Sequence, residues 1–477
     1  MPDTTPALVS PVLQGRVADL IRQHHLPGAA TGVVRDQHLI WSAGFGYADI
    51  AGRRVPDEHT LYRVASITKT FTATAIMQLR DAGRLRLDDP LVLHLPQFAS
   101  VICRHGAIED VTIRRLLSHQ SGLITEGPFS YWDTLDFPVM EAVLAGLAET
   151  EVVIEPATAT KYSNLAYALL GEVVGRLSGR PYEEYVRSEI FEPLGMTSST
   201  FAPDGNLQHR LATGYNPHPF EDSPEPAGHT GTKGITAAAG LYTTVDDLAR
   251  WIGLQLRAGT QDRDDPPVLK AITLEAMHLP VAFDPAWNSA NCLGWAALRR
   301  GEQIFHGHGG SIHGFITQIL FSKPARLGVI VLTNEGRHAA ANTIAVEMLQ
   351  MLLEHEPGVE NPASWEPPLP TPSQWRRLLG QYEFWRGGMV HIEYRDGMLR
   401  LALPPGVTQA LHAPAVLRPT EQEQTFCIEG GRAAGELLRF RLAPSGAVLG
   451  FTVAGFTYDR LIAAEKRTGD SGLTTEV

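Results

Sequence analysis

Ser66 and Lys69 lie three residues apart at the start of an apolar stretch, and this spacing could support nucleophilic chemistry. Residues i and i+3 share one face of a helix, so Ser66 Oγ and Lys69 Nζ can meet. The chain has only six lysines in 477 residues, and the residues after Lys69, TFTATAIMQL, are small or apolar. We therefore expect Lys69 to be buried, which would lower its pKa and let it act as a base. The alternative, that Lys69 only pairs with a carboxylate or caps a polar pocket, stays open here.

Two further motifs supply polar groups that suit the same reaction. Tyr162 and Asn164 form a Y-x-N triplet just before an amphipathic helical pattern. A phenol beside an ammonium can relay a proton, and the amide can hold a substrate amide or the lysine. His308, Gly309 and Gly310 stand at the predicted edge of a strand. Glycines at this place let a substrate backbone approach closely and leave backbone N–H groups free for an oxyanion.

The elements that must position these residues follow from hydrophobic periodicity. A helix is predicted over 12–24, a hairpin over 27–49, helical structure from Ser66 to about Leu194, and a helix over 244–256 that Thr244 can cap. Three strands follow, one ending at His306, one over 315–321 and one over 327–332, and then a helix over 340–355. Strands at both ends with helices between them predict an α+β domain whose sheet unites the N- and C-terminal parts.

The C-terminal quarter of the chain has a different character. Residues 356–375 contain six prolines, which is typical of a stiff linker. About eight short strands follow in roughly 90 residues, a pattern that fits a small antiparallel barrel or sandwich. We therefore predict a first domain over 1–355, a linker over 356–371, a β-barrel over 372–465 and a tail over 466–477.

The order and spacing of S-x-x-K at Ser66, Y-x-N at Tyr162 and H-x-G at His308 resemble the serine β-lactamase and penicillin-binding protein superfamily, in particular its class C and DD-peptidase branch. Two phrases are also similar to that branch, LLSHQSGL at 116–123 and AAGLYTTVDDLARW at 238–251. The resemblance covers almost the whole region before the proline-rich linker. It implies an antiparallel sheet flanked by helices plus an all-helical region, and the trailing strands resemble the lipocalin-like barrels appended to some of these hydrolases.

The resemblance also implies roles for individual residues. Ser66 would be the nucleophile of an acyl-enzyme, Lys69 its base or proton relay, and Tyr162 the partner base or acid. Asn164 would hold the substrate. The backbone N–H group of Ser66 would form one half of an oxyanion hole.

The third motif would line the cleft from its strand. His308, Gly309 and Gly310 would contact the substrate, and the N–H group of Ser311 would complete the oxyanion hole. β-Lactamases of this branch have K-T-G here, where lysine and threonine bind the substrate carboxylate. Because His308 is a weaker cation and Gly309 has no hydroxyl, we expect efficient β-lactam hydrolysis to be disfavoured. Histidine also occurs at this position in DD-peptidases, so the resemblance implies a peptidase or amidase acting on small or D-amino-acid-containing peptides. A carboxylesterase or a weak β-lactamase is the alternative.

Other classes of site fit the sequence less well. His306, His308 and His313 would suit a zinc site only with further ligands, and no cysteine lies nearby, so we expect no metal and no other cofactor. The G-x-S-x-G pentapeptide of α/β-hydrolases does not occur. A non-catalytic penicillin-recognising protein remains an alternative, although every expected catalytic position holds a competent side chain.

Composition limits the partners of the chain. A formal net charge of −12 argues against nucleic acid, and no window of 18 uninterrupted apolar residues predicts a membrane span. The expected partner is a small-molecule or short peptide substrate, and the chain could form a homo-oligomer. Three distant cysteines and the lack of a secretory signal predict a cytoplasmic protein, or a periplasmic or secreted one if a leader was removed.

Overall fold

The structure, a computed structural model, describes residues 11–129, 131–218, 220–221, 223–258, 268–336, 340–354, 370–384, 388–395, 397–402, 415–430, 433–453 and 455–461. The chain divides into two compact units. Unit 1 contains the residues up to Asn216 and Pro226–Pro367, and unit 2 contains Pro217–Glu225 and the residues from Pro368 onward. The predicted tail and all but the last two residues of the predicted linker lie outside the described residues.

Unit 1 is built on an eight-stranded antiparallel sheet with the strand order β2-β1-β14-β13-β12-β11-β10-β9. Its strands are β1 (Gly28–Arg35), β2 (His38–Gly46), β9 (Ala282–Phe283), β10 (Ser289–Asn291), β11 (Ala296–Arg300), β12 (Gln303–Ile312), β13 (Phe315–Ser322) and β14 (Leu327–Thr333). The N- and C-terminal parts of the unit meet where β1 pairs with β14. The predicted α+β architecture is therefore confirmed.

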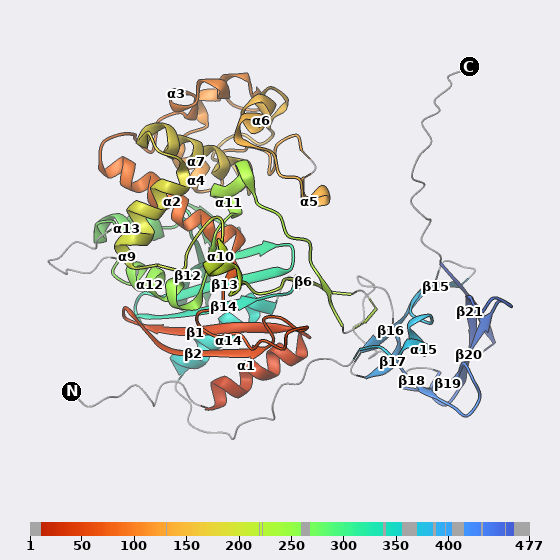
Figure 1. Ribbon diagram of the computed structural model, residues 1–477. Coiled ribbons are helices and arrows are strands. Elements are labelled where there is room, and N and C mark those ends of the chain that lie inside the picture. The colour runs from red at the N-terminus through yellow and green to blue at the C-terminus, as the bar shows by residue number, and fades with distance from the viewer. Residues whose placement is uncertain are drawn as a thin grey trace, which may run out of the picture. The chain divides into compact units, whose positions relative to one another are not determined.

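Both faces of this sheet are covered by helices, which explains why its central strands are apolar throughout (Figure 1). On one face lie α1 (Pro11–Gln23) and α14 (Ala340–Glu354), whose Val17 and Ile344 share a core with Val33 of β1. On the other face lie α2 (Thr68–Asp81), α7 (Asn164–Ser178), α11 (Thr236–Ala239) and α12 (Val245–Gln255). Successive strand residues point to opposite faces, so Val34 joins this second core.

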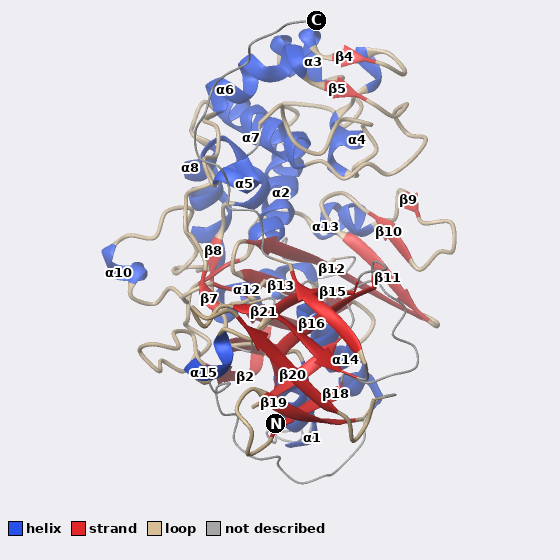
Figure 2. Cartoon of the chain, turned by 90° about the vertical axis from the view of Figure 1, so that its right-hand side faces the viewer, coloured by secondary structure: helices blue, strands red, loops and turns tan. Residues whose placement is uncertain are grey.

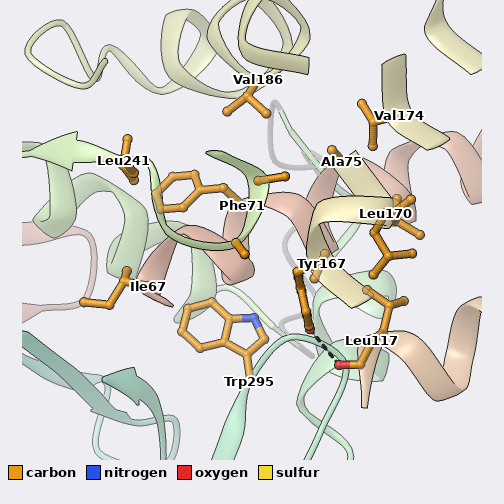
Figure 3. Close-up of a cluster of buried hydrophobic side chains, with 14 of the residues drawn as sticks. Ile67, Phe71, Ala75, Leu117, Tyr167, Leu170, Val174, Val186, Leu241 and Trp295 are labelled. Atoms are coloured by element: carbon orange, nitrogen blue, oxygen red, sulfur yellow. Dashed lines mark hydrogen bonds between the residues drawn. The ribbon is translucent and has the colours of Figure 1, made fainter. Parts of the chain in front are cut away.

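The second core also anchors the helical region, which gathers on one side of the sheet (Figure 2). Figure 3 shows Phe71 of α2 and Tyr167 of α7 within this core, where the Tyr167 hydroxyl donates to the carbonyl of Leu117. Thr244 caps α12, as predicted, by accepting a hydrogen bond from the backbone N–H of Asp247. In the described ranges, no helix has the length and apolar content that crossing a bilayer requires.

Strand β12 runs further than its sequence indicates. We expected it to end at His306, but it continues to Ile312 and pairs with β13 along its length. The neighbouring strand β11 pairs with β12 only as far as Gly307. In the described structure, the edge of β12 from His308 onward is therefore open on the side away from β13.

Unit 2 contains a closed antiparallel barrel of eight strands, as the sequence predicts. The strands are β15 (Gly380–Phe384), β16 (Gly388–Arg395), β17 (Met398–Ala402), β18 (Ala415–Pro419), β19 (Thr425–Glu429), β20 (Leu437–Leu442), β21 (Val448–Val453) and β22 (Phe456–Arg460). Pro217–Glu225 also belongs to this unit. Phe220 packs against the barrel core, and its carbonyl accepts a 2.6 Å hydrogen bond from the backbone N–H of Tyr394. The sequence patterns did not predict this contribution.

Gly310 of β12 should be intolerant of a side chain. A Cβ atom at this position would lie 2.0 Å from the carbonyl oxygen of Val64, on the segment that leads to Ser66. Overpacking of this kind costs about 1–3 kcal/mol, so we expect Gly310→Ala to lower the free energy of unfolding by that amount. A Cβ at Gly309 would come too close only to the end of the Gln318 side chain, at 2.7 Å, and would lie at an ordinary 3.5 Å from the carbonyl oxygen of Thr317. Denaturant unfolding that gives Gly310→Ala and Gly309→Ala equal stabilities would contradict this packing.

Candidate active site

Ser66 lies in a single turn of 3₁₀ helix, Ala65–Ile67, that leads directly into α2. Hydrogen bonds on both sides hold this turn in place. The N–H group of Val64 donates to the carbonyl of Leu241, and the Thr68 hydroxyl donates to the carbonyl of Ala65. Ala65 has a φ of 46°, a left-handed conformation that is uncommon for a residue with a side chain. Ser66 itself is half-buried, so its hydroxyl is both fixed and accessible.

Lys69 follows on α2 and has no exposed surface. Its Nζ atom donates to Ser66 Oγ at 3.1 Å, to Asn164 Oδ1 at 2.7 Å and to the carbonyl of Ala238 at 2.8 Å. Burial disfavours the charged form and lowers the pKa of Lys69 to about 7, although the negative charge of Glu126 acts in the opposite direction. Near neutral pH a large share of Lys69 is therefore a free amine, which can accept a proton.

Tyr162 stands on the other side of the serine. Its hydroxyl donates to Ser66 Oγ at 2.9 Å, and its ring centroid lies 4.9 Å from Lys69 Nζ. The residue as a whole is 38% exposed. Removal of the hydroxyl from water raises the pKa of Tyr162 to about 12, so the phenol is protonated at neutral pH. The ring of His119 packs against the Tyr162 ring, and His119 Nδ1 accepts a hydrogen bond from the N–H of Ser163. His119 thus braces the tyrosine.

Asn164 connects the lysine to a carboxylate that the sequence did not reveal. Its Nδ2 atom donates to Glu126 Oε1 at 2.6 Å, while its Oδ1 atom accepts from Lys69. The second carboxylate oxygen of Glu126 accepts a hydrogen bond from the Tyr131 hydroxyl. Both ends of the predicted substrate-holding amide are therefore engaged within the protein. Only the proximity of Glu126 to the SHQSGL phrase could have drawn attention to it.

His308 lies at the open edge of β12 and makes no hydrogen bond to Ser66 or Lys69. Its Nδ1 atom lies 2.6 Å from the carbonyl oxygen of Gly309. A carbonyl can only accept, so this nitrogen carries the proton and Nε2 is left as an acceptor. Burial and the positive charge of Lys69 lower the pKa of His308 to about 4. The imidazole is therefore neutral at physiological pH and differs in charge from the lysine of K-T-G.

The register of β12 determines which of its backbone groups face the open edge. The two-residue turn His313–Gly314 joins β12 to β13, and the pair that flanks it, Ile312 and Phe315, is hydrogen-bonded. From this pair along the hairpin, non-hydrogen-bonded and hydrogen-bonded pairs alternate. Ser311, one residue back, is thus in a non-hydrogen-bonded pair. Its N–H group points away from β13, toward the edge that β11 does not cover. That group is free to donate to a ligand.

His306, one of the histidines considered above as metal ligands, contacts a backbone carbonyl and an aromatic ring. His306 is buried, and its Nε2 atom lies 3.1 Å from the carbonyl oxygen of His278. Its ring stacks on that of Phe321. Within the part of the chain that the structure describes, no group of three or more histidine, cysteine or acidic side chains could hold a metal ion.

Two curated relatives share much of the sequence. Penicillin-binding protein 4 of Amycolatopsis lactamdurans is 30% identical over 388 residues, which cover 78% of this chain and 96% of that protein. Protein flp of Staphylococcus aureus strain MRSA252 is 27% identical over 319 residues, or 66% of this chain. The match spans only 60% of the length of Protein flp.

Solved structures resemble nearly the whole chain, including its C-terminal part. The octameric penicillin-binding protein homologue from Pyrococcus abyssi matches with a TM-score of 0.62 and 25% identity, over 94% of this chain and 99% of that one. SurE in complex with D-Leu matches with a TM-score of 0.57 and 22% identity, over 94% of this chain and 99% of that one. These similarities agree with the two-unit fold described above.

A family model described as Beta-lactamase matches residues 13–350, which is most of the chain. Together with the relative that is 30% identical over almost its whole length, this match shows that the chain belongs to the beta-lactamase family of serine hydrolases, which includes the penicillin-binding proteins.

Proposed function

We propose that the protein is a serine hydrolase that forms an acyl-enzyme on Ser66. The observation that supports this most directly is the position of Ser66 Oγ, 3.1 Å from Lys69 Nζ and 2.9 Å from the Tyr162 hydroxyl. A hydroxyl held between a free amine and a protonated phenol has a base to accept its proton and a donor to pass one on.

The reaction proceeds in two steps. Lys69 takes the proton of Ser66 as Oγ attacks a carbonyl carbon, and the N–H groups of Ser66 and Ser311 receive the developing oxyanion. The Lys69 ammonium returns the proton to the leaving group through Tyr162, and the C–N or C–O bond breaks. Water then releases the acyl group, or an acceptor amine or alcohol takes it. Asn164 holds the lysine throughout, and its second amide hydrogen is left for the substrate.

The proposed substrates are small or D-amino-acid-containing peptides. Because His308 is neutral and Gly309 has no hydroxyl, the third motif lacks a cation that could bind a substrate carboxylate. β-Lactams carry such a carboxylate, so we expect them to be poor substrates. SurE, a protein of the same fold, binds D-Leu according to its structure, and we extend this stereochemistry to the present chain. A carboxylesterase is the second candidate, because the same uncharged histidine also suits a neutral ester.

The function is tested with wild type and Ser66→Ala on three chromogenic substrates: a D-alanine anilide, a short p-nitrophenyl ester and a cephalosporin. We expect wild type to cleave the anilide and the ester, the cephalosporin to turn over slowest, and Ser66→Ala to lose about 10³-fold or more on each. Cleavage confined to the ester would make the protein an esterase. Cleavage that survives in Ser66→Ala would remove Ser66 from the reaction, and a lack of any turnover would favour a binding protein.

The pH dependence of the reaction should report on Lys69. Because the base must be neutral and the pKa of Lys69 is about 7, kcat/KM should rise tenfold per pH unit below this value and level off above it. Initial rates between about pH 5 and pH 9 measure this profile.

His308→Asn is the matched control, because the pKa of His308, about 4, lies outside this range. The variant should keep the midpoint near that of wild type, whatever its rate. A midpoint that disappears in His308→Asn would assign the titration to the histidine and refute Lys69 as the base.

A further inference from the structure

We infer that Glu126 is a positioning residue that orients the amide of Asn164 and thereby aims the Lys69 amine at Ser66. The inference rests on the proposed function, since it concerns how the same nucleophile is activated. No motif of the sequence identifies Glu126, and its place in the structure assigns this role.

Hydrogen bonds place Glu126 beside Asn164. The carbonyl of Thr125 accepts a 2.8 Å hydrogen bond from the N–H of Asn164, and the Thr125 hydroxyl accepts one of the same length from Lys161 Nζ. The Ser163 hydroxyl donates to the carbonyl of Ile124 at 2.7 Å. The loop that carries Glu126 is therefore joined residue by residue to the segment that starts α7.

The contact with Glu126 decides which way the Asn164 amide faces. An ionised carboxylate only accepts hydrogen bonds, so the end of the amide that meets Glu126 Oε1, at 2.6 Å, must be the NH₂ group. The oxygen end is then directed at Lys69, at 2.7 Å. A reversed amide would place its NH₂ group against the N–H groups of Lys69 and would bring an oxygen against the carboxylate.

This orientation fixes the lone pair of the neutral lysine. A free amine has two N–H groups and one lone pair. Two of the three neighbours of Lys69 Nζ, Asn164 Oδ1 and the carbonyl of Ala238, can only accept. They take both N–H groups, so the lone pair is left for the third neighbour, the Ser66 hydroxyl at 3.1 Å. Without Glu126 the first of these acceptors is no longer fixed.

Glu126 is itself held in place. Its second oxygen accepts from the hydroxyl of Tyr131, a buried residue whose ring packs against Trp132 and Phe137. The phenol of Tyr131 is a dependable donor, because burial and the nearby negative charge raise its pKa. One chain of hydrogen bonds thus runs from Tyr131 to Ser66.

The charge of Glu126 matters as well as its geometry. The titratable groups that act on one another around Lys69 in the described structure are Glu126, His119, Tyr162, Tyr167 and His308. The histidines are neutral because burial lowers the pKa of each, and burial raises that of each tyrosine. Glu126 is thus the one negative charge in this group, and it favours the Lys69 ammonium against the effect of burial. Its removal must move the titration of Lys69 to lower pH.

The test is the pH profile of acylation by p-nitrophenyl acetate, followed by the burst of p-nitrophenol and by mass spectrometry of the Ser66 peptide. Glu126→Gln keeps an oxygen that can accept from Asn164 but loses the charge, so we expect the midpoint to fall by roughly half a unit to one unit, and the plateau rate to fall less than in Glu126→Leu. Glu126→Leu also loses the acceptor, so its plateau rate should fall by roughly 10²-fold. Glu155→Gln, which removes an exposed carboxylate from a nearby loop, is the matched control and should behave as wild type.

The outcomes separate two failures. If wild type itself is not acylated at Ser66, the proposed function is wrong and this inference falls with it. If wild type is acylated but Glu126→Gln and Glu126→Leu keep the midpoint and rate of Glu155→Gln, only the inference about Glu126 is overturned. Thermal unfolding checks each variant, and if Glu126→Leu fails to fold, the midpoint of Glu126→Gln decides the question.

Discussion

The arrangement of unit 1 depends on the burial of one amine. A lysine with no exposed surface must find an acceptor for every N–H group, because an unpaired donor or an uncompensated charge in the interior is costly. The acceptors come from three distant parts of the chain: Ser66 before α2, Asn164 at the start of α7 and Ala238 in α11. The packing of these helices on the sheet therefore sets the geometry of the site, and the apolar core around Phe71 and Tyr167 stabilises that packing.

Much of this site could be predicted from the sequence, because its strongest signals are local. The run of small and apolar residues after Lys69 indicates burial, and burial is what the structure shows. The spacing of Ser66 and Lys69 needs only one helical turn, and the helix cap at Thr244 needs only three residues. The alternation of apolar and polar residues that predicts the eight barrel strands can be seen within each strand by itself.

The features that could not be predicted depend on distant partners. Glu126 sits in a loop without periodicity, and its importance arises only when the loop meets the start of α7, 38 residues further on. The expected end of β12 at His306 was wrong because glycine is unfavourable in strands, whereas the pairing with β13 carries the strand through Gly309 and Gly310. His308 was identified by its motif, but its neutrality depends on the buried surroundings that the fold creates.

The contribution of Pro217–Glu225 to unit 2 affects how this unit could be exchanged between two-part hydrolases. Glu221 is only 6% exposed; its carboxylate accepts a hydrogen bond from the Thr371 hydroxyl and lies 3.7 Å from the Arg376 guanidinium. Phe220 covers part of the barrel core. Unit 2 is thus assembled from two separate stretches of chain, although all eight barrel strands come from the second. Its transfer to another hydrolase requires two exchanges, one at the C-terminus and one in the middle of the first domain, so this architecture is not a simple tandem fusion.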